Sequence, residues 1–209
     1  MNKLYSKVLT LNTKKSLKEI SSYKFLSDFY LGGGTALALH LGHMMSKDLD
    51  FFSTSDFNDS LIIQYLSEKN RFSLEKRDVQ TIIGIFNTIK ISFLKYSYLL
   101  LAPPLEFQGI KIAAIPDIIC MKIEAISTRG SKRDFIDLYF ALKNGFSLSE
   151  ALKLFETKYA SVKYNMTHIF KSLVYFTDAD NEPPPIMIKK YGWDEIKTYF
   201  IKEVSKHLK

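Results

Sequence analysis

The amino-acid sequence predicts an α/β protein, with an α+β core built around a sheet and a helical C-terminal half. Three observations support this prediction: a short apolar strand that runs into three glycines, alternating β-branched and aromatic residues over 72–96, and helical patterns from Asp117 onward. We therefore expect an N-terminal arm over residues 1–28, the α/β core over 29–115, and a helical region packed on the core over 116–209.

The predicted elements follow in order along the chain. Residues 29–31 read as a buried strand, and the apolar run after the glycines predicts a helix that starts at Ala36. Residues 48–52 form the next strand. The later elements are a helix over 60–70, two or three antiparallel strands over 72–96 with a turn at Asn87, a strand over 110–113, and helices over 117–128, 149–159, 165–176 and 193–208.

The glycine turn is a candidate anion site. Glycine permits the positive φ of a tight turn, and the helix that follows offers unpaired N–H groups and the positive end of its dipole. Without Cβ atoms at Gly33 and Gly34, a triphosphate can approach the backbone closely, and the Thr35 hydroxyl can donate to a phosphate oxygen. A plain chain reversal at the same glycines is the alternative.

Two carboxylates, Asp48 and Asp50, stand at the head of the next strand. Side chains alternate along a strand, so both carboxylates share one face while Leu49 and Phe51 point into the core. Such a pair suits Mg²⁺ (or Mn²⁺), which takes oxygen ligands and completes its shell with water and substrate phosphate. An exposed strand without a metal is the alternative.

The order of these motifs resembles a known family. The segments Gly33-Gly34-Thr35-Ala36-Leu37-Ala38-Leu39 and Ser46-Lys47-Asp48-Leu49-Asp50-Phe51-Phe52 look like the first motif of polymerase-β-type nucleotidyltransferases, and more narrowly of the AbiEii/AbiGii toxin family. Later segments follow the same family order over residues 89–96, 109–113, 117–122 and 129–139. The resemblance covers residues 23–143.

This resemblance implies a fold and an activity. The expected fold is a polymerase-β-like nucleotidyltransferase core with a mixed sheet. The implied enzyme moves an NMP from an NTP–Mg²⁺ complex to an acceptor hydroxyl on tRNA or a protein. Its implied setting is the toxin of a type IV toxin–antitoxin or phage-defence pair, with a cognate antitoxin as a partner.

The resemblance also implies site residues. It assigns nucleotide binding to Gly33, Gly34, Thr35, Ser46 and Lys122, metal binding to Asp48 and Asp50, and catalysis to Asp48, Asp50, Lys122 and Asp134. Two positions depart from the family pattern. Met44 stands where arginine is usual, and Ser92 holds the best position for a third carboxylate, so a complete two-metal site is not assured.

Several of these residues have a second interpretation from the sequence alone. Lys122 emerges from an apolar helix face, which suits contact with a phosphate but also a lysine whose stem covers core side chains. Asp134 lies three residues after Ser131, as in a variant capping box, so a structural cap competes with a catalytic base or a partner for Lys122. Asp137 is one turn after Arg133 and is able to pair with it.

Composition narrows the class of protein. The chain is 46% hydrophobic, yet no apolar run approaches the roughly 20 residues of a membrane span, and the N-terminus lacks the apolar segment of a signal peptide. We expect a cytoplasmic protein without membrane contact. The single cysteine, Cys120, excludes an internal disulfide, and the four histidines have no metal spacing. The net charge of +7 fits an acceptor with a phosphate backbone or a solvated lysine-rich surface.

Two rival functions are open at this point. A transferase of similar architecture that modifies a small molecule, as in antibiotic nucleotidylation, would label a metabolite. A degenerate NTP- or RNA-binding module, which Ser92 and Met44 favour, would bind without turnover and would still bind after Asp50→Ala.

Overall fold

The structure, a computed structural model, describes residues 4–68 and 71–207. Its elements, grouped by type, are 3-10 helices η1 (Ser6–Val8) and η2 (Lys24–Asp28), strands β1 (Tyr30–Leu31), β2 (Leu49–Ser53), β3 (Phe72–Asp78), β4 (Thr81–Phe86), β5 (Ile89–Lys95), β6 (Leu105–Phe107) and β7 (Ile110–Ile112), and helices α1 (Leu11–Ile20), α2 (Gly33–Leu41), α3 (Asp59–Ser67), α4 (Ile115–Thr128), α5 (Lys132–Lys143), α6 (Leu148–Lys158), α7 (Met166–Leu173), α8 (Thr177–Asp180) and α9 (Trp193–Ser205).

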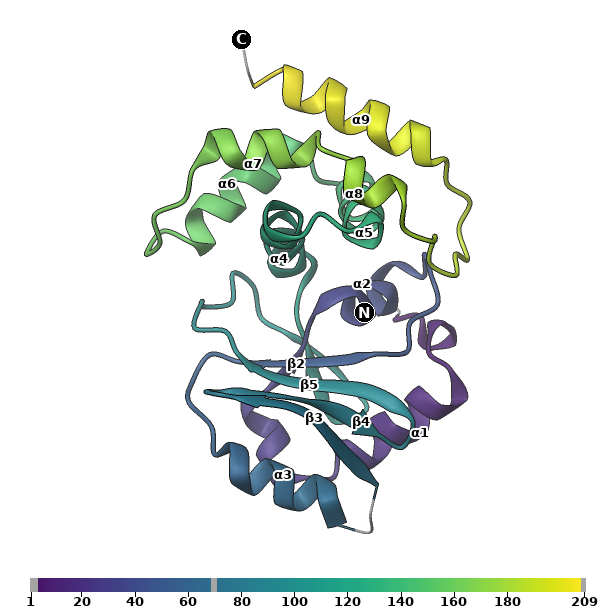
Figure 1. Ribbon diagram of the computed structural model, residues 1–209, viewed down its shortest axis with the longest axis vertical. Helices are drawn as coiled ribbons and strands as arrows, with labels where there is room; N and C mark the ends of the chain where they lie inside the picture. The colour runs from purple at the N-terminus through teal and green to yellow at the C-terminus, as the bar shows by residue number, and fades with distance from the viewer. Residues whose placement is uncertain (1–3, 69–70, 208–209) are drawn as a thin grey trace.

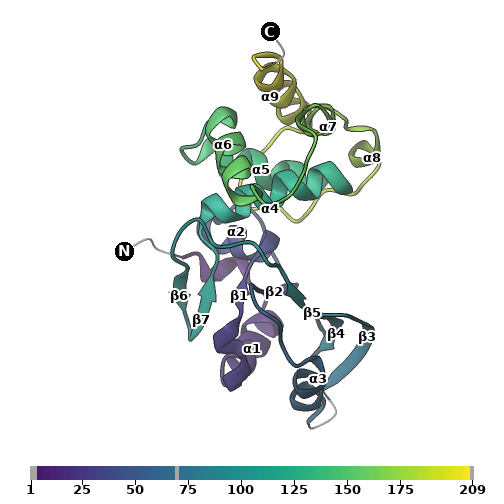
Figure 2. The same ribbon diagram turned by 90° about the vertical axis from the view of Figure 1, so that its left-hand side faces the viewer.

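The strands form one mixed sheet, with helices on both sides (Figures 1 and 2). Its strand order within the described residues is β3-β4-β5-β2-β1-β7-β6. Strand β2 runs parallel to β5 and antiparallel to β1, so it occupies the middle of the sheet. Helices α1 and α3 lie on one side, whereas α2 lies on the other side, between the sheet and the stack of helices α4–α9 (Figure 1). The expected α/β core and helical C-terminal half are therefore present.

Aromatic side chains fill the space beneath the centre of the sheet. Phe51 on β2 stacks on Phe93 of β5, with ring centroids 5.3 Å apart, and Phe29 meets the Phe93 ring edge-on at 5.3 Å. All three rings are almost fully buried. Burial of this kind fixes the register of β2, because a slip by one residue would bring its carboxylates into the core.

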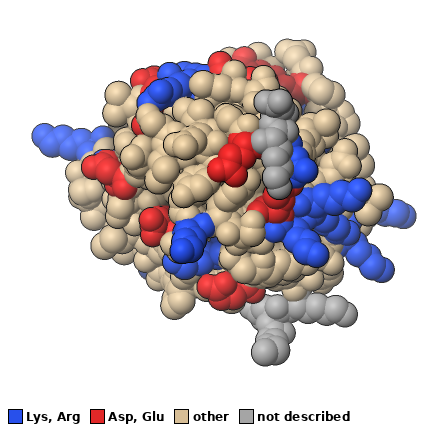
Figure 3. Space-filling view, turned by 90° about the horizontal axis from the view of Figure 1, so that it is seen from below, with Lys and Arg blue, Asp and Glu red and all other residues tan. Residues whose placement is uncertain are grey.

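The N-terminal segment packs against the core as part of it. Val8, Leu17 and Ile20 are buried, and Leu9 forms a parallel bridge with Ser46. The segment contains η1, α1 and η2, and its described residues pack on the core and do not form a separate arm. Seen from the side of α1 and α3, the molecule carries lysine and arginine side chains with acidic ones between them, and several of the basic side chains lie together at the right of the view (Figure 3).

Local turn chemistry gave correct predictions, whereas two helix boundaries were wrong. Asn87 has a φ of 49° and Thr88 a φ of 71°, which form the tight turn between two antiparallel strands. The helix after the glycines begins at Gly33 and not at Ala36. The helix expected over 165–176 ends at Leu173, and a separate short helix follows it.

Strand β6 was not expected from the sequence. The ends of the helices expected over 60–70 and 193–208 fall partly on residues 69–70 and 208, outside the described residues. Within the described part of the chain, no helix has both the length and the apolar character needed to cross a membrane.

Candidate functional site

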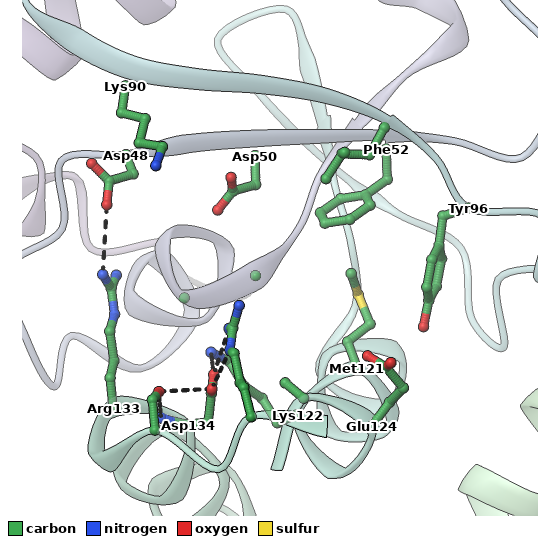
Figure 4. A pocket seen from close by; sticks show the side chains of 16 residues that line it. Asp48, Asp50, Phe52, Lys90, Tyr96, Met121, Lys122, Glu124, Arg133 and Asp134 are labelled. Atoms are coloured by element: carbon green, nitrogen blue, oxygen red, sulfur yellow. Dashed lines mark hydrogen bonds and ion pairs between the residues drawn. The ribbon is translucent and has the colours of Figure 1, made fainter. Parts of the chain in front are cut away.

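A cavity of about 430 Å³ opens between β2 and the helices α4 and α5. Its walls include Gly33 and Gly34 at the start of α2, Asp48 and Asp50 from the sheet side, and residues of α4 and α5 on the opposite side. Figure 4 shows the two aspartates facing Arg133 across this space. The expected D-x-D pair and the glycine turn, which are separated by more than a dozen residues, therefore line one cavity.

The two aspartates take the alternating positions that the sequence predicts. Leu49 and Phe51 are fully buried beneath the sheet, while Asp48 and Asp50 line the cavity. Ser92 lies directly opposite Asp50 in the parallel β2–β5 pair, and its hydroxyl donates to Asp50 Oδ1 at 2.6 Å. The position expected for a third carboxylate thus faces Asp50, but it supplies a hydroxyl that fixes the rotamer of the aspartate.

A chain of hydrogen bonds beneath the cavity holds the backbone at Asp48. The Thr35 hydroxyl donates to the Asp48 carbonyl, so the Ser46 hydroxyl must donate to Thr35 Oγ1, at 2.6 Å. Ser46 Oγ in turn accepts from the Arg133 guanidinium at 2.8 Å. Each hydroxyl proton is therefore used once, and the loop that carries Asp48 is tied to helix α5.

This arrangement differs from the expected nucleotide contacts of Thr35 and Ser46. Thr35 is 1% exposed and Ser46 is 3% exposed, and neither side chain lines the cavity. Their hydroxyls are already used within the protein, so the structure makes both of them supports for Asp48. The sequence could not reveal this, because the partner, Arg133, is 87 residues from Ser46.

Arg133 places a cation beside the D-x-D pair. In the family pattern, the cation near this strand is an arginine at the position of Met44. The Arg133 guanidinium lies 3.8 Å from Asp48 Oδ2. Met44 is fully buried and bridges Met187 in the C-terminal region. A basic group next to the D-x-D pair is therefore present although Met44 replaces arginine.

The start of helix α2 offers free backbone groups to the cavity. Gly33 has a φ of +62°, and within residues 4–68 and 71–207 no side chain caps the start of α2. The first N–H groups of a helix have no partner within it, so an anion in the cavity has donors available here. A Cβ atom on Gly34 would lie 2.8 Å from Arg133 Nη2 and 3.1 Å from Asp137 Oδ2. The glycine is therefore needed for close packing of α5 against α2.

We expect Gly34→Ala to lower the affinity of the protein for nucleotides by at least about tenfold, because the added methyl group displaces the Arg133 guanidinium from Ser46 and Asp48. Isothermal titration with each NTP measures this loss. Gly192→Ala is the matched control, because its φ of −116° suits alanine and the atom nearest to the added Cβ, Glu195 Cβ, lies at an ordinary contact distance of 3.4 Å. Equal affinities for Gly34→Ala and the parent protein would contradict the packing argument.

A buried charge network lies behind the cavity. The Lys122 ammonium is 2.8 Å from Asp134 Oδ1 and 2.6 Å from Asp137 Oδ2, and Lys122 is only 4% exposed. Asp137 Oδ1 also lies 2.7 Å from His43 Nε2, and Arg129 binds Asp134 with two nitrogens. The network joins α4 and α5 to the loop after α2.

These contacts decide between the alternative roles that the sequence allows for Asp134 and Asp137. Asp137 pairs with His43 and Lys122, and no ion pair forms between Asp137 and Arg133, the alternative that the sequence left open. Ser131 is the N-cap of α5 and accepts from the Asp134 N–H, so the predicted cap is confirmed. The Asp134 carboxylate is at the same time the partner of Lys122. A phosphate that approaches Lys122 would have to share its ammonium with two carboxylates.

The cations of the network lower the pKa of the Asp134 and Asp137 carboxyl groups. Burial alone would raise the pKa of Asp134, but the Lys122 ammonium and the Arg129 guanidinium hold it well below its usual range. Lys122 and His43 lower the pKa of Asp137 against the same effect of burial. In the opposite direction, the two carboxylates outweigh desolvation and raise the pKa of Lys122.

The lowered pKa of Asp134 predicts a specific loss of stability in acid. The unfolded chain takes up a proton near pH 3.9 and the folded chain only at lower pH, so the stabilisation is complete above about pH 5 and falls as the pH drops below 4. For one such proton, the free energy of unfolding falls by about 1.4 kcal/mol per pH unit. Urea unfolding at several pH values between 7 and 3 gives the free energy of unfolding as a function of pH. This free energy should fall less steeply with decreasing pH in Asp134→Asn than in the parent protein. An unchanged slope would contradict this assignment.

A segment of the C-terminal region also braces the loop between α2 and β2. The N–H groups of Ile188 and Lys189 donate to the His43 carbonyl at 2.8 and 3.0 Å, and Met45 donates to the Ile186 carbonyl. These contacts come from residues beyond the region of family resemblance, 23–143. The helical half therefore supports the D-x-D loop as well as forming the opposite wall of the cavity.

Several lining residues were not singled out from the sequence. Lys90, Tyr96, Glu124 and Arg133 all face the cavity (Figure 4). The alternation of β5 could have indicated Lys90, because it lies on the same strand face as Ser92. Glu124 carried no such signal, since its position depends on how the two halves of the chain meet, and the sequence suggested Arg133 only as a partner for Asp137.

The donor set fits a divalent cation that is also bound by its substrate. Asp50 on β2 and Asp48 directly before it both offer carboxylate oxygens to the cavity, and Asp50 Oδ2 lies 3.3 Å from the place a Cβ on Gly33 would take. Among the described residues, no group of three or more His, Cys, Asp and Glu side chains forms a complete metal site. The remaining ligands would have to be water and phosphate oxygens, as is usual for Mg²⁺.

Comparisons with known proteins identify the family and the fold. A family model described as nucleotidyl transferase AbiEii toxin, type IV TA system, matches residues 15–100 and 86–197. An uncharacterised protein of Aquifex aeolicus (strain VF5) is 38% identical over 200 residues, which cover 93% of this chain and 95% of that protein.

Solved structures share the fold at low sequence identity. JHP933 from Helicobacter pylori gives a TM-score of 0.52 at 19% identity, over 98% of this chain and 96% of that chain. MenT4, a nucleotidyltransferase toxin from Mycobacterium tuberculosis H37Rv, gives 0.56 at 12% identity, over 85% and 75%. These likenesses confirm the expected polymerase-β-like nucleotidyltransferase core. The chain belongs to the nucleotidyltransferase AbiEii toxin family of type IV toxin–antitoxin systems.

Proposed function

We propose that this toxin-family nucleotidyltransferase transfers an NMP from an NTP to a hydroxyl group of an RNA acceptor, with tRNA as the candidate. One observation carries the proposal: Asp48 and Asp50 share a cavity with the uncapped glycine start of helix α2. Carboxylates that suit a cation and N–H groups that suit phosphate thus lie within the length of one triphosphate.

Different residues of the cavity would bind the metal ion and the phosphates of the nucleotide. Asp48 and Asp50 would hold Mg²⁺ (or Mn²⁺), which when bound neutralises phosphate charge and orients the phosphates for displacement. The N–H groups at Gly33 and Gly34 would bind non-reacting phosphate oxygens. Arg133, next to Asp48, would bind the same phosphates. The triphosphate is thereby fixed before the acceptor arrives.

The transfer is a single in-line displacement. The acceptor oxygen forms a bond to the α-phosphorus, the bond between that phosphorus and the bridging oxygen breaks, and pyrophosphate leaves with the electron pair. The hydroxyl proton passes to water. Charge increases on the bridging oxygen during this step, and preorganised cations stabilise such charge most strongly.

In this proposal Lys122 contributes its positive charge, and Asp134 holds the Lys122 ammonium in place. The lowered pKa of Asp134 makes its carboxylate a weak proton acceptor, which argues against a general base and favours its role as the partner of Lys122. Together with Asp137 it holds the Lys122 ammonium at the back of the cavity. From there the ammonium offsets the negative charge of the phosphates through space.

The basic residues around the opening favour a polyanionic acceptor. Lys90, Arg129 and Arg133 line the cavity, and the whole chain has a net charge of +7. Cations that neutralise backbone phosphates release counterions and so strengthen binding of nucleic acid. A protein hydroxyl gains less from these groups. The toxin setting further implies a cognate antitoxin that opposes the activity.

One observation favours a second function. Ser92 stands opposite Asp50 where a third carboxylate would complete a two-metal site. The second candidate is therefore a module that binds NTP without turnover.

The test is a search for the labelled acceptor. The protein would be incubated with each α-³²P-labelled NTP, Mg²⁺ or Mn²⁺ and a cell extract, beside an Asp48→Ala/Asp50→Ala variant. The proposal expects a labelled band that ribonuclease removes and protease does not, and only with intact aspartates. A protease-sensitive band would assign a protein acceptor, and a labelled metabolite would assign a small-molecule transferase. Metal-dependent NTP binding without any label would assign the binding module.

A further inference from the structure

A lysine of strand β5 lies beside the first aspartate of the D-x-D pair. Asp50 is opposite Ser92 in the parallel β2–β5 pair. Asp48 and Lys90 come two positions earlier in their respective segments, so the same register brings them next to each other at the face that carries Asp50. Both side chains line the cavity, and Figure 4 shows Lys90 extended toward the two aspartates. The ammonium therefore faces the space in which the metal ion and the phosphates would bind.

The N–H groups of the Lys90 ammonium are free to bind a ligand. In the part of the chain that the structure describes, no hydrogen bond or ion pair joins this ammonium to another residue. The neighbour of Lys90 on its other side, in strand β4, is the apolar Ile85. The lysine side chain is exposed, so a phosphate reaches it without displacing a protein contact.

The other cations that line the cavity are already bound within the protein. Lys122 and Arg129 are both ion-paired with Asp134. The guanidinium of Arg133 lies 3.8 Å from an aspartate of the D-x-D pair. Among the described residues that line the cavity, Lys90 is therefore the cation whose charge is available to a substrate without the loss of an existing contact.

Ser92 removes one negative charge from the site, and Lys90 adds one positive charge. A two-metal site clamps the attacking and leaving oxygens with two ions, which carboxylates hold in place. At Ser92 a hydroxyl takes the place of a third carboxylate and donates to Asp50 Oδ1 at 2.6 Å, so it brings no charge that would hold a second ion. Two carboxylates with one divalent ion and one ammonium have the same net charge as three carboxylates with two divalent ions. The phosphates therefore meet the same positive charge in both arrangements.

We propose that Lys90 takes the place of a second metal ion, so that the site works with one divalent cation, held by Asp48 and Asp50, and one ammonium. This inference rests on the proposed function, because it takes the position of the phosphates from that proposal. The Lys90 ammonium donates to an oxygen of the α-phosphate and stabilises the charge that develops there as the acceptor oxygen attacks and pyrophosphate leaves. Lys90 keeps its proton throughout, so the bonds that form and break are those of the in-line displacement.

The number of bound Mn²⁺ ions tests this proposal in the parent protein itself. Isothermal titration first identifies an α,β-methylene NTP, which cannot release pyrophosphate, that binds in the presence of Mn²⁺. The protein and this analogue, mixed one to one well above their dissociation constant, are then titrated with Mn²⁺, and free Mn²⁺ is measured by electron paramagnetic resonance. We expect one Mn²⁺ in the parent complex. We expect two in Lys90→Met/Ser92→Asp, which restores a third carboxylate and removes the ammonium.

The rate of label transfer provides the second measurement. Lys90→Met should lower kcat by about 100-fold or more, the effect of removing one preorganised donor from a developing charge. The dissociation constant for the NTP should change less than about tenfold, because the metal ion and the helix N-terminus remain. Lys76→Met changes an exposed lysine of β3 outside the cavity and is the matched control.

Each other outcome overturns a distinct claim. Two Mn²⁺ ions in the parent complex would show that the second metal ion is present, and this result does not depend on the folding of any variant. A kcat for Lys90→Met within about threefold of the parent value would show that the ammonium does not act on the reacting phosphate. Both results would overturn the role of Lys90 and leave the proposed function standing. Absence of metal-dependent binding for all four NTP analogues would overturn the proposed function itself.

Discussion

Asp50→Asn is expected to lower the rate of nucleotidyl transfer by about 10³-fold or more and to leave the fold intact. The amide keeps the shape of the side chain and still accepts the hydrogen bond from Ser92, at 2.6 Å in the parent protein. It removes the negative charge that would hold the cation, and metal coordination of a transferring phosphoryl group contributes several kcal/mol of transition-state stabilisation. In this variant the transfer rate should therefore fall while the stability of the fold is retained.

The measurement is the initial rate of label transfer at saturating NTP, with the unfolding midpoint of each variant determined in parallel. Asp28→Asn makes the same chemical change at an exposed position outside the cavity and should leave the rate unchanged. A rate for Asp50→Asn within about tenfold of the parent rate would remove Asp50 from the catalytic site.

Asp117→Ala is expected to destabilise the protein by about 3–5 kcal/mol, because it leaves the Lys158 ammonium without its counter-charge. Both side chains are fully buried, with Lys158 Nζ 2.6 Å from Asp117 Oδ1. The carboxylate also accepts from the backbone N–H groups of Leu101 and Ala102. One substitution therefore removes the counter-charge of a buried cation and the acceptor of two backbone N–H groups.

Urea unfolding at pH 7 measures this effect. Lys158→Met should cost less than Asp117→Ala, because the carboxylate it leaves behind retains both backbone donors. Asp56→Ala removes the partner of Lys95 at a largely exposed position and should change the free energy of unfolding little. Equal effects of Asp117→Ala and Asp56→Ala would mean that the buried pair contributes no more than a surface one.

The sequence predicted those features that depend on near neighbours. Alternation placed Asp50 of β2, and Asp48 directly before this strand, at the open face of the sheet, and Asn87 marked the turn between β4 and β5. Cys120 is buried as a small apolar residue, as its neighbours indicate. In each case the determining contacts lie within a few residues or follow from strand periodicity.

The supporting contacts of the site could not be predicted in this way. The His43–Asp137 contact joins residues 94 positions apart, and only the docking of α5 on α2 brings them together. The same docking buries Thr35 and Ser46, which a local motif places at the phosphates. Family resemblance identifies which residues matter here, but the structure shows that these two act through the backbone of Asp48.

The most direct test of nucleotidyl transfer is to compare each NTP labelled with ³²P at the α-phosphate and at the γ-phosphate, with the RNA fraction of a cell extract as acceptor. Attack on the α-phosphorus predicts that label from at least one α-³²P-NTP enters RNA, that label from the corresponding γ-³²P-NTP leaves as pyrophosphate, and that both signals disappear in Asp48→Ala/Asp50→Ala. Entry of the γ-label into RNA would show transfer of a terminal phosphoryl group and would contradict the account.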